Sequence, residues 1–150
     1  MSVVGLTRRR ALLLGLAALP VGYLAWSRIL AGDFGGPALN PAQAHAMAQA
    51  GGLALIDIRR PDEWALTGIG QGATPLDMRR KDFDDALAAR VAGDRTAPIA
   101  LICARGVRSA RLGNRLLAAG FSNIRDVPEG MLGSGAGPGW IARGLPLVTG

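Results

Sequence analysis

Cysteine and histidine are almost absent from this sequence. Its 150 residues include one cysteine, Cys103, and one histidine, His45. A single cysteine excludes an internal disulfide framework and a metal site built from several thiolates. His45 has no second candidate ligand near it in the sequence. We therefore expect no metal and no cofactor, and a surface or packing role for His45.

Aromatic residues are also scarce, at 5% of the chain, and the positive charge is unevenly distributed. The formal net charge is +6, but four of the 17 basic residues lie in the first thirty positions. From residue 31 onward, 13 basic and 11 acidic residues leave a net charge of 13 − 11 = +2. A domain of this composition lacks the excess of positive charge and the aromatic side chains with which proteins bind nucleic acids. We expect no nucleic-acid partner.

Residues 1–31 have the pattern of a signal peptide or a membrane anchor. A basic stretch, Arg8 to Arg10, precedes 17 uncharged residues that are interrupted by Pro20. This length is just under the ~18–20 residues of a spanning helix. The segment from Thr7 to Leu13 resembles the twin-arginine export signal, although the Phe and Lys usual in that signal are missing. A general secretory signal or an ordinary signal anchor is the alternative.

The basic flank of such a segment stays on the cytoplasmic side, so the domain behind it is expected outside the cytoplasmic membrane. We predict a periplasmic protein, or one anchored to the inner membrane with its domain on the periplasmic side. Cleavage after Ala31 and retention of the anchor are both open. An uncleaved segment would provide a membrane contact.

A glycine- and proline-containing linker over residues 32–39 leads into one domain, residues 40–150. Asn40 and Pro41 can begin a helix that Gly51 ends. The remaining pattern alternates strands and helices, and the strand candidates are short apolar runs. In order, the segments are strand 53–57, helix 61–68, strand 73–77, helix 80–93, strand 97–103, helix 108–120 and strand 123–127. This order predicts an α/β fold with a central, mostly parallel sheet and helices on both faces, preceded by an N-terminal signal or anchor helix.

Cys103 follows a buried strand and precedes a helix, so it lies at the edge of the sheet where ligands bind in such folds. The first N–H groups of a helix have no intrahelical partner and carry the positive end of its dipole. These donors favour a thiolate, and we expect an exposed, reactive thiol. The alternative is that Cys103 is a small core residue.

The residues after Cys103 are suited to binding an anion. Gly106 permits a tight turn, so that successive N–H groups, including that of Val107, converge on one point. Arg105 and Arg108 can add forked hydrogen bonds to an oxyanion. Ser109 can support this loop or act as an ordinary helix-start serine. Further along the helix, Arg111 and Arg115 are expected on a solvated face.

Three segments together resemble the single-domain rhodanese-like sulfurtransferases: "LIDIRRPDEW", "ALICARGVRS" and "GWIARGLPLV". The resemblance covers nearly all of residues 40–149 and implies the rhodanese fold. It also implies that Cys103 carries sulfur as a persulfide and that Asp57 and Arg59 brace the active-site loop. Glu63 matches an acidic residue that often follows in the family.

The sequence departs from the family in two places. Thr67-Gly68-Ile69 stands where the family commonly has a Gly-His-Ile stretch. A glycine-rich segment lies between Met131 and Trp140, and we expect it to affect the rim of the site. Trp64 and Trp140 are expected to be core or lid residues.

The resemblance implies transfer of sulfur from a small anionic donor such as thiosulfate to a thiol or cyanide acceptor. Two alternatives stay open. One is phosphate or arsenate chemistry, although the related cysteine phosphatases have their arginine six positions after the cysteine and Arg108 is five positions after Cys103. The other is a non-enzymatic sulfur carrier or redox sensor.

Overall fold

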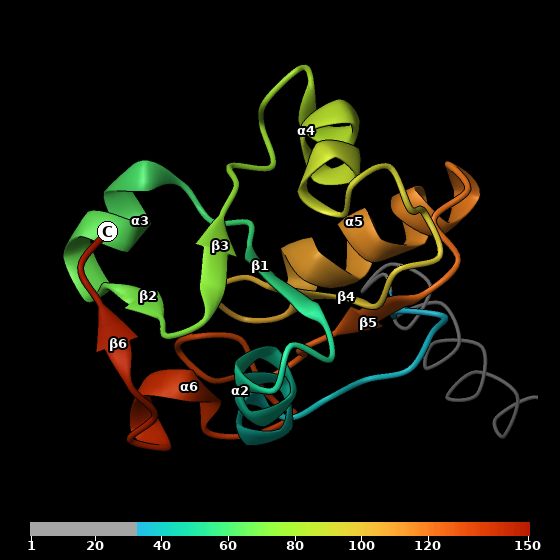
Figure 1. Ribbon diagram of the computed structural model, residues 1–150. Helices are drawn as coiled ribbons and strands as arrows, with labels where there is room; N and C mark the ends of the chain where they lie inside the picture. Colours follow the sequence, from blue (N-terminus) through green and yellow to red (C-terminus); the bar gives the residue numbers. More distant parts are fainter. Residues whose placement is uncertain (1–32) are drawn as a thin grey trace, which may run out of the picture. The chain divides into compact units, whose positions relative to one another are not determined.

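The computed structural model describes residues 33–150, and a sheet of four short parallel strands forms its centre (Figure 1). In spatial order the strands are β3 (Ala73–Pro75), β1 (Ala54–Asp57), β4 (Ile99–Ile102) and β5 (Ile124–Asp126). All four residues of β4 are buried, because helices cover both faces of the sheet. The predicted α/β fold with a central parallel sheet is confirmed. The predicted export segment lies outside the described residues.

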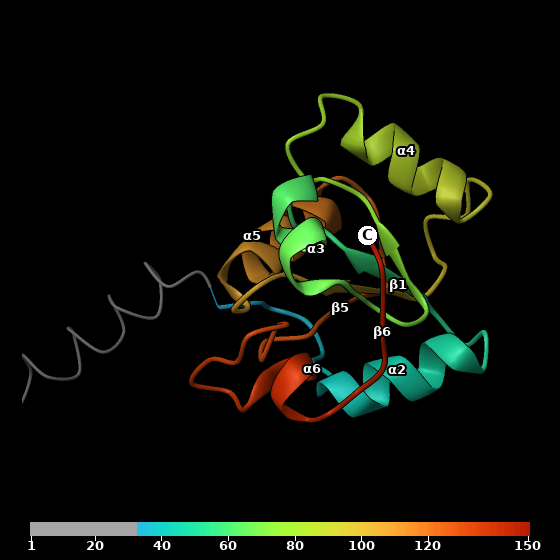
Figure 2. The same cartoon turned by 90° about the vertical axis from the view of Figure 1, so that its left-hand side faces the viewer.

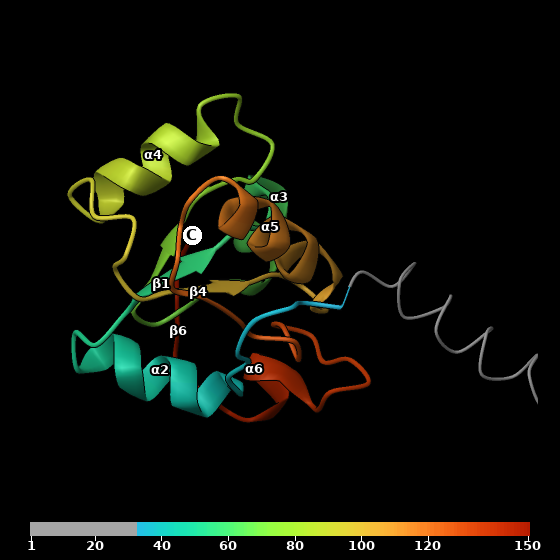
Figure 3. The ribbon, with the colours of Figure 1, turned by 90° about the vertical axis from the view of Figure 1, so that its right-hand side faces the viewer.

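Helices cover the two faces of the sheet in pairs (Figures 2 and 3). On one face lie α4 (Phe83–Arg90) and α5 (Val107–Ala118), and on the other lie α2 (Pro41–Gln49) and α6 (Gly139–Ala142). Each face has its own apolar core. The first core contains Ile56, Ile58, Phe83, Leu87, Ile99, Leu101, Leu112, Leu116, Phe121 and Ile124. The second contains Ala44, Leu53, Leu55, Ala100, Ile102, Val127, Met131 and Trp140.

Helix α2 begins at Asn40 and Pro41, as the sequence predicts. The Asn40 side chain accepts a hydrogen bond from the Gln43 N–H at 2.9 Å, and the Gln43 side chain accepts one from the Asn40 N–H at 3.0 Å. This reciprocal cap satisfies two backbone donors at the helix start. His45 on α2 makes an edge-to-face contact with the ring of Trp140, with 5.4 Å between centroids. His45 therefore has the expected packing role.

The helix predicted over residues 80–93 is shorter in the structure, where α4 begins at Phe83. Residues 77–80 form a turn instead, in which the Arg79 N–H donates to the Asp77 carboxylate at 2.9 Å. An aspartate that bonds the backbone two residues later competes with helix formation. At the other end, α4 ends at Arg90, three residues earlier than predicted, and Gly93 with φ +82° closes the turn that follows.

Three short elements are not predicted by the sequence. They are α6, near the end of the chain, and the two strands of an antiparallel pair, β2 (Ile69–Gly70) and β6 (Leu147–Val148). Two-residue strands are too short to show an alternating pattern. Trp140 of α6 is completely buried against Gly70, where a side chain would collide with the indole ring. Trp140 is therefore a core residue.

Residues 37–39, within the predicted linker, lie along the edge of β5. The Leu39 N–H donates to the Asp126 carbonyl at 2.8 Å, and the Asp126 N–H donates to the Pro37 carbonyl at 3.1 Å. The compact unit comprises Phe34–Gly150. Within residues 33–150, no helix is long and apolar enough to cross a membrane.

Candidate active site

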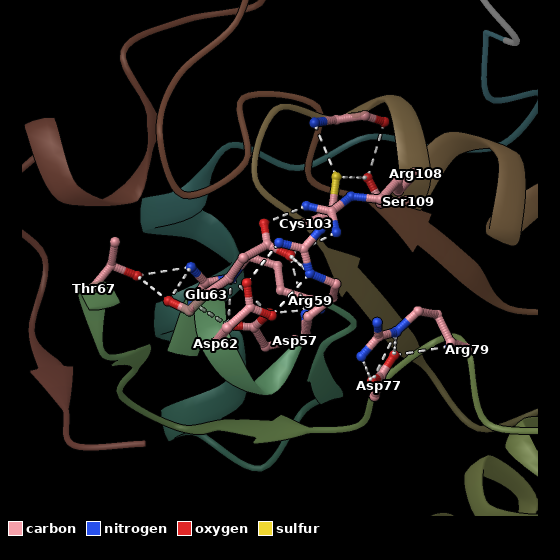
Figure 4. A network of polar contacts seen from close by, with 12 residues as sticks. Asp57, Arg59, Asp62, Glu63, Thr67, Asp77, Arg79, Cys103, Arg108 and Ser109 are labelled. Carbon is pink, nitrogen blue, oxygen red and sulfur yellow. Dashed lines mark hydrogen bonds and ion pairs between the residues drawn. The ribbon is translucent and has the colours of Figure 1, made fainter. Parts of the chain in front are cut away.

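The carboxyl ends of β1 and β4 bring Asp57 and Cys103 to the same edge of the sheet (Figure 4). Asp57 is the last residue of β1 and pairs with Ile102, the last residue of β4. Cys103 follows directly, at the beginning of the loop that leads into α5. A third element, α3 (Pro61–Thr67), follows β1 and borders the same region. The site is thus built from the segments after two adjacent strands, as the sequence predicts.

The Cys103 thiol is buried, with 1% of the residue exposed, so the expectation of an exposed thiol is wrong. The loop folds back over the sulfur: the Gly106 N–H donates to Sγ at 3.1 Å. From the first turn of α5, the Ser109 hydroxyl lies 3.5 Å from Sγ and donates to the Gly106 carbonyl at 3.0 Å. The sulfur of Cys103 is thus enclosed by the backbone and the side chain of its own loop and of the first turn of α5.

Gly106 is required by both the conformation and the space in the loop. It adopts φ +85°, in the left-handed region that side chains other than glycine rarely occupy. A Cβ at this position would also collide with the carbonyl oxygen of Pro128. This turn brings the Gly106 N–H to the sulfur and directs the chain into α5. The role predicted for Gly106 in shaping the loop agrees with this geometry.

Backbone hydrogen bonds join the cysteine loop to the start of the glycine-rich segment. The Met131 N–H donates to the Cys103 carbonyl and the Leu132 N–H donates to the Ala104 carbonyl, both at 2.9 Å. Gly130 adopts φ +67°, and a side chain there would collide with the Ala104 carbonyl. The segment supports the loop through backbone contacts that sequence reasoning did not assign.

Arg105 and Val107 lie on the exposed side of the loop. The Arg105 guanidinium donates to the Gly133 carbonyl at 3.2 Å, and the Val107 residue is 48% exposed. Further along α5, Arg111 is exposed and Arg115 pairs with Asp84 of α4 at 2.8 Å. The prediction of a solvated face for these two later arginines is confirmed.

Arg108 makes a forked ion pair with Glu63 of α3, at 2.6 and 2.8 Å. The hydrogen bond from Arg108 lowers the pKa of Glu63. Glu63 in turn raises the pKa of Arg108, and the negative charge of a Cys103 thiolate raises it further. The guanidinium of Arg108 therefore links α3 to the first turn of α5, directly after the cysteine loop.

Asp57 and Arg59 form a fully buried ion pair. The Arg59 guanidinium donates to both carboxylate oxygens of Asp57, at 2.7 to 3.1 Å, and to the Thr67 hydroxyl and the Gly68 carbonyl. This pair therefore braces α3 and the residues after it. It does not bond directly to the cysteine loop, which α3 reaches through the Glu63–Arg108 pair. Thr67, in the segment that departs from the family pattern, was not predicted to take part.

Asp126, the last residue of β5, was not identified from the sequence. It is 3% exposed, and its Oδ1 has no hydrogen-bond partner among the described residues. Burial raises the pKa of this carboxyl to about 6. The sequence signal is an aspartate within a short apolar strand.

The buried carboxyl predicts a specific pH dependence of stability. Its pKa is higher in the folded protein than in the unfolded chain, so the folded state holds the proton more tightly. The corresponding stabilisation is complete below about pH 4 and is lost as the pH rises through about 6. We expect Asp126→Asn to raise the free energy of unfolding at pH 7.5 by on the order of 2–3 kcal/mol. At pH 4 the gain should disappear, as urea unfolding at the two pH values would show. An equal gain at both would contradict this origin.

Within residues 33–150, no cluster of three or more His, Cys, Asp or Glu side chains is arranged to hold a metal ion.

Comparison with known proteins identifies one family. A model of the rhodanese-like domain matches residues 40–134. No curated protein matches the chain. The polysulfide-sulfur transferase homodimer of Wolinella succinogenes is similar in structure, with a TM-score of 0.62 and 24% identity over 87% of this chain and 90% of that one.

Two further solved structures are similar to this chain. Thiosulfate sulfurtransferase from Pseudomonas aeruginosa has a TM-score of 0.59 and 25% identity over 76% of this chain and 20% of that one. A Rhodopseudomonas palustris protein described as a possible tyrosine phosphatase has a TM-score of 0.55 and 22% identity over 75% of this chain and 84% of that one. The family match covers more than half of the sequence and includes both Asp57 and Cys103. The chain therefore belongs to the rhodanese-like family.

Proposed function

We propose that this protein is a sulfurtransferase that carries sulfane sulfur on Cys103, with thiosulfate or a similar anion as donor. Its family and the sulfurtransferases among its structural neighbours support sulfurtransferase activity in general. The observation that carries the finer proposal is the loop around Cys103. A backbone N–H and a hydroxyl lie at the sulfur, and the guanidinium of Arg108 interacts with its charge.

The proposed reaction has two displacement steps. The Cys103 thiolate attacks the outer sulfur of thiosulfate, a new S–S bond forms, and the S–S bond of the donor breaks as sulfite leaves with the electron pair. A thiolate or cyanide acceptor then attacks the outer sulfur of the persulfide, and the Cys103 thiolate is released. The N–H groups at the start of α5 and the arginines of the loop would stabilise the charge of the donor and of the leaving sulfite.

Sulfur loading tests this proposal directly. Intact-mass measurement after thiosulfate treatment should show a gain of one sulfur atom, which dithiothreitol removes. Steady-state kinetics with thiosulfate and cyanide should be ping-pong, because sulfite leaves before the acceptor binds. A sequential pattern would contradict the mechanism. Loading without turnover would indicate a stoichiometric sulfur carrier.

Phosphate chemistry is the competing function, because one structural neighbour is described as a possible tyrosine phosphatase. In this chain the spacing from Cys103 to Arg108 gives a shorter loop than that of the related phosphatases. We therefore expect turnover of thiosulfate to exceed that of p-nitrophenyl phosphate. The reverse order would favour the phosphatase.

Arg105 and Arg108 are expected to contribute differently to the reaction. Arg105 is exposed, so Arg105→Ala should mainly raise KM for thiosulfate through a loss of binding. Arg108→Ala should also lower kcat, because it removes the charge beside the sulfur and breaks the pair with Glu63. Each effect should be on the order of ten- to a hundredfold. Steady-state kinetics of both variants measures the difference, and identical changes in kcat and KM would contradict it.

For the N-terminal segment we propose export to the periplasmic side of the inner membrane. The basis is the basic flank, the apolar stretch and the paired arginines Arg8 and Arg9. Residues 1–35 fused to a reporter that is active only in the periplasm should give signal. Exchange of both arginines for lysine should abolish it if the twin-arginine route is used. Undiminished export would indicate another route.

A further inference from the structure

The segment between β5 and α6 contains a buried carboxylate, Glu129, that the proposed sulfur transfer does not use. Glu129 is 3% exposed. One of its oxygens accepts a hydrogen bond from the Gly139 N–H at 3.0 Å, and the Arg143 guanidinium donates to both oxygens at 2.7 and 2.8 Å. A carboxylate is rarely buried unless it is paired in this way. Glu129 therefore fixes the start of α6 against the residues that follow β5.

Gly139 connects Glu129 to the rim of the site. A side chain at Gly139 would collide with the backbone of Gly133, so the two glycines lie against each other. The carbonyl of Gly133 accepts a hydrogen bond from the Arg105 guanidinium at 3.2 Å. A single backbone contact thus separates the residue held by the buried carboxylate from the residue that holds Arg105.

Backbone hydrogen bonds also join α6, the glycine-rich segment and the cysteine loop. The Trp140 N–H of α6 donates to the Gly130 carbonyl at 3.0 Å. Two residues after Gly130, the Leu132 N–H donates to the Ala104 carbonyl of the cysteine loop at 2.9 Å. A shift at the start of α6 is therefore expected to reach the loop.

Arg105 is the loop arginine whose charge no carboxylate balances among the described residues. Its guanidinium donates to a neutral carbonyl, that of Gly133, whereas Arg108 is paired with Glu63 at 2.6 Å. A carbonyl orients a guanidinium without neutralising it. Arg105 thus remains available to an anion, and its orientation depends on the position of Gly133.

We propose that Glu129 is a positioning residue for the anionic sulfur donor. By fixing the start of α6 it fixes the Gly133 carbonyl, which holds the Arg105 guanidinium on the exposed side of the loop. The proposal rests on the proposed function, in which Arg105 binds the donor. Ordering a free arginine side chain costs conformational entropy, so a guanidinium that is already oriented binds an anion more tightly.

Steady-state kinetics of the full-length protein with thiosulfate and cyanide tests this role. Glu129→Gln keeps the shape of the side chain and removes its charge, which weakens the bonds to Gly139 and Arg143. KM for thiosulfate should rise roughly three- to tenfold, while kcat and KM for cyanide stay within about twofold. In an Arg105→Ala background the same substitution should change KM for thiosulfate by less than about twofold, because the guanidinium that Glu129 positions is absent.

Asp84→Asn is the matched control. Asp84 of α4 also forms a forked ion pair, with Arg115 of α5 at 2.8 and 3.0 Å, and this pair involves neither the cysteine loop nor the glycine-rich segment. Its loss should leave kcat and both KM values unchanged. If Glu129→Gln does not fold, Arg143→Lys gives the same test, because it keeps a cation and loses the forked contact.

Amide hydrogen exchange tests the positioning without any substrate. In Glu129→Gln the Leu132 N–H should exchange at least about tenfold faster than in the wild type, beyond any change at the amides of β4, which report global unfolding. Unchanged exchange at Leu132 would overturn the proposal, and so would an equal rise in KM for thiosulfate with and without Arg105. If the wild type does not turn over thiosulfate, the proposed function fails, and exchange alone decides whether Glu129 holds the loop.

Discussion

Cys103→Ser is expected to abolish sulfur transfer, with a loss on the order of 10⁴-fold or more in turnover. A serine hydroxyl is a much weaker nucleophile at neutral pH, and it cannot form a persulfide. The geometry adds a second reason: the Gly106 N–H and the Ser109 hydroxyl are placed at the distances of a sulfur atom. No group elsewhere in the chain can take over, because Cys103 is the only thiol.

The Cys103→Ser variant should remain folded, so that the loss of turnover can be assigned to the missing thiol and not to unfolding. Cys103 packs with the apolar core below α5, and replacement of its sulfur with a hydroxyl costs about 1–2 kcal/mol. The new hydroxyl retains hydrogen-bond partners in the loop, which limits that cost. Turnover of thiosulfate with cyanide, sulfur loading by intact mass, and a melting curve should be measured together. Wild-type turnover in this variant would end the persulfide mechanism.

Arg59→Met is expected to lower the free energy of unfolding by about 3–5 kcal/mol, the largest stability effect that we predict. The substitution leaves the Asp57 carboxylate buried, with the residue 0% exposed and without its guanidinium partner. It also removes the donors to Thr67 and Gly68 that hold the end of α3. Urea unfolding gives the change directly.

Two control variants test whether the lost stability comes from the unpaired, buried Asp57 carboxylate. Asp57→Leu combined with Arg59→Met removes both charges and should recover much of the lost stability, because no unpaired buried charge remains. Arg80→Met breaks an exposed pair with Asp82 and should change stability by less than about 1 kcal/mol. If the double variant is no more stable than Arg59→Met, the cost arises from lost packing instead of the stranded carboxylate.

The double variant also tests how the brace supports the site. It should fold, yet α3 would lack its contacts to Arg59, and the position of Glu63 next to Arg108 would be less well defined. We expect lower sulfurtransferase activity than its stability alone would suggest. Full activity in the folded double variant would show that the brace serves stability only.

Local signals in the sequence predicted the central parallel sheet and most of the helices that cover it. Short apolar runs alternate with helical segments, and Asn40 and Gly106 mark where helices begin. These signals act over a few residues, because capping and turn geometry depend on near neighbours in the chain. The same reasoning placed Asp57 and Cys103 at one edge of a parallel sheet, since both follow buried strands.

The tertiary structure decided the features that depend on contacts between distant residues. Glu63 and Arg108 are 45 positions apart, and no local pattern could show that they form an ion pair. The burial of the thiol, the support from the glycine-rich segment and the burial of Asp126 likewise depend on how β5 and the loops pack around α5. The sequence alone predicted which residues lie at the strand ends and at the helix start, because these positions are encoded locally. Only the packing decided which charges and hydrogen bonds act on them.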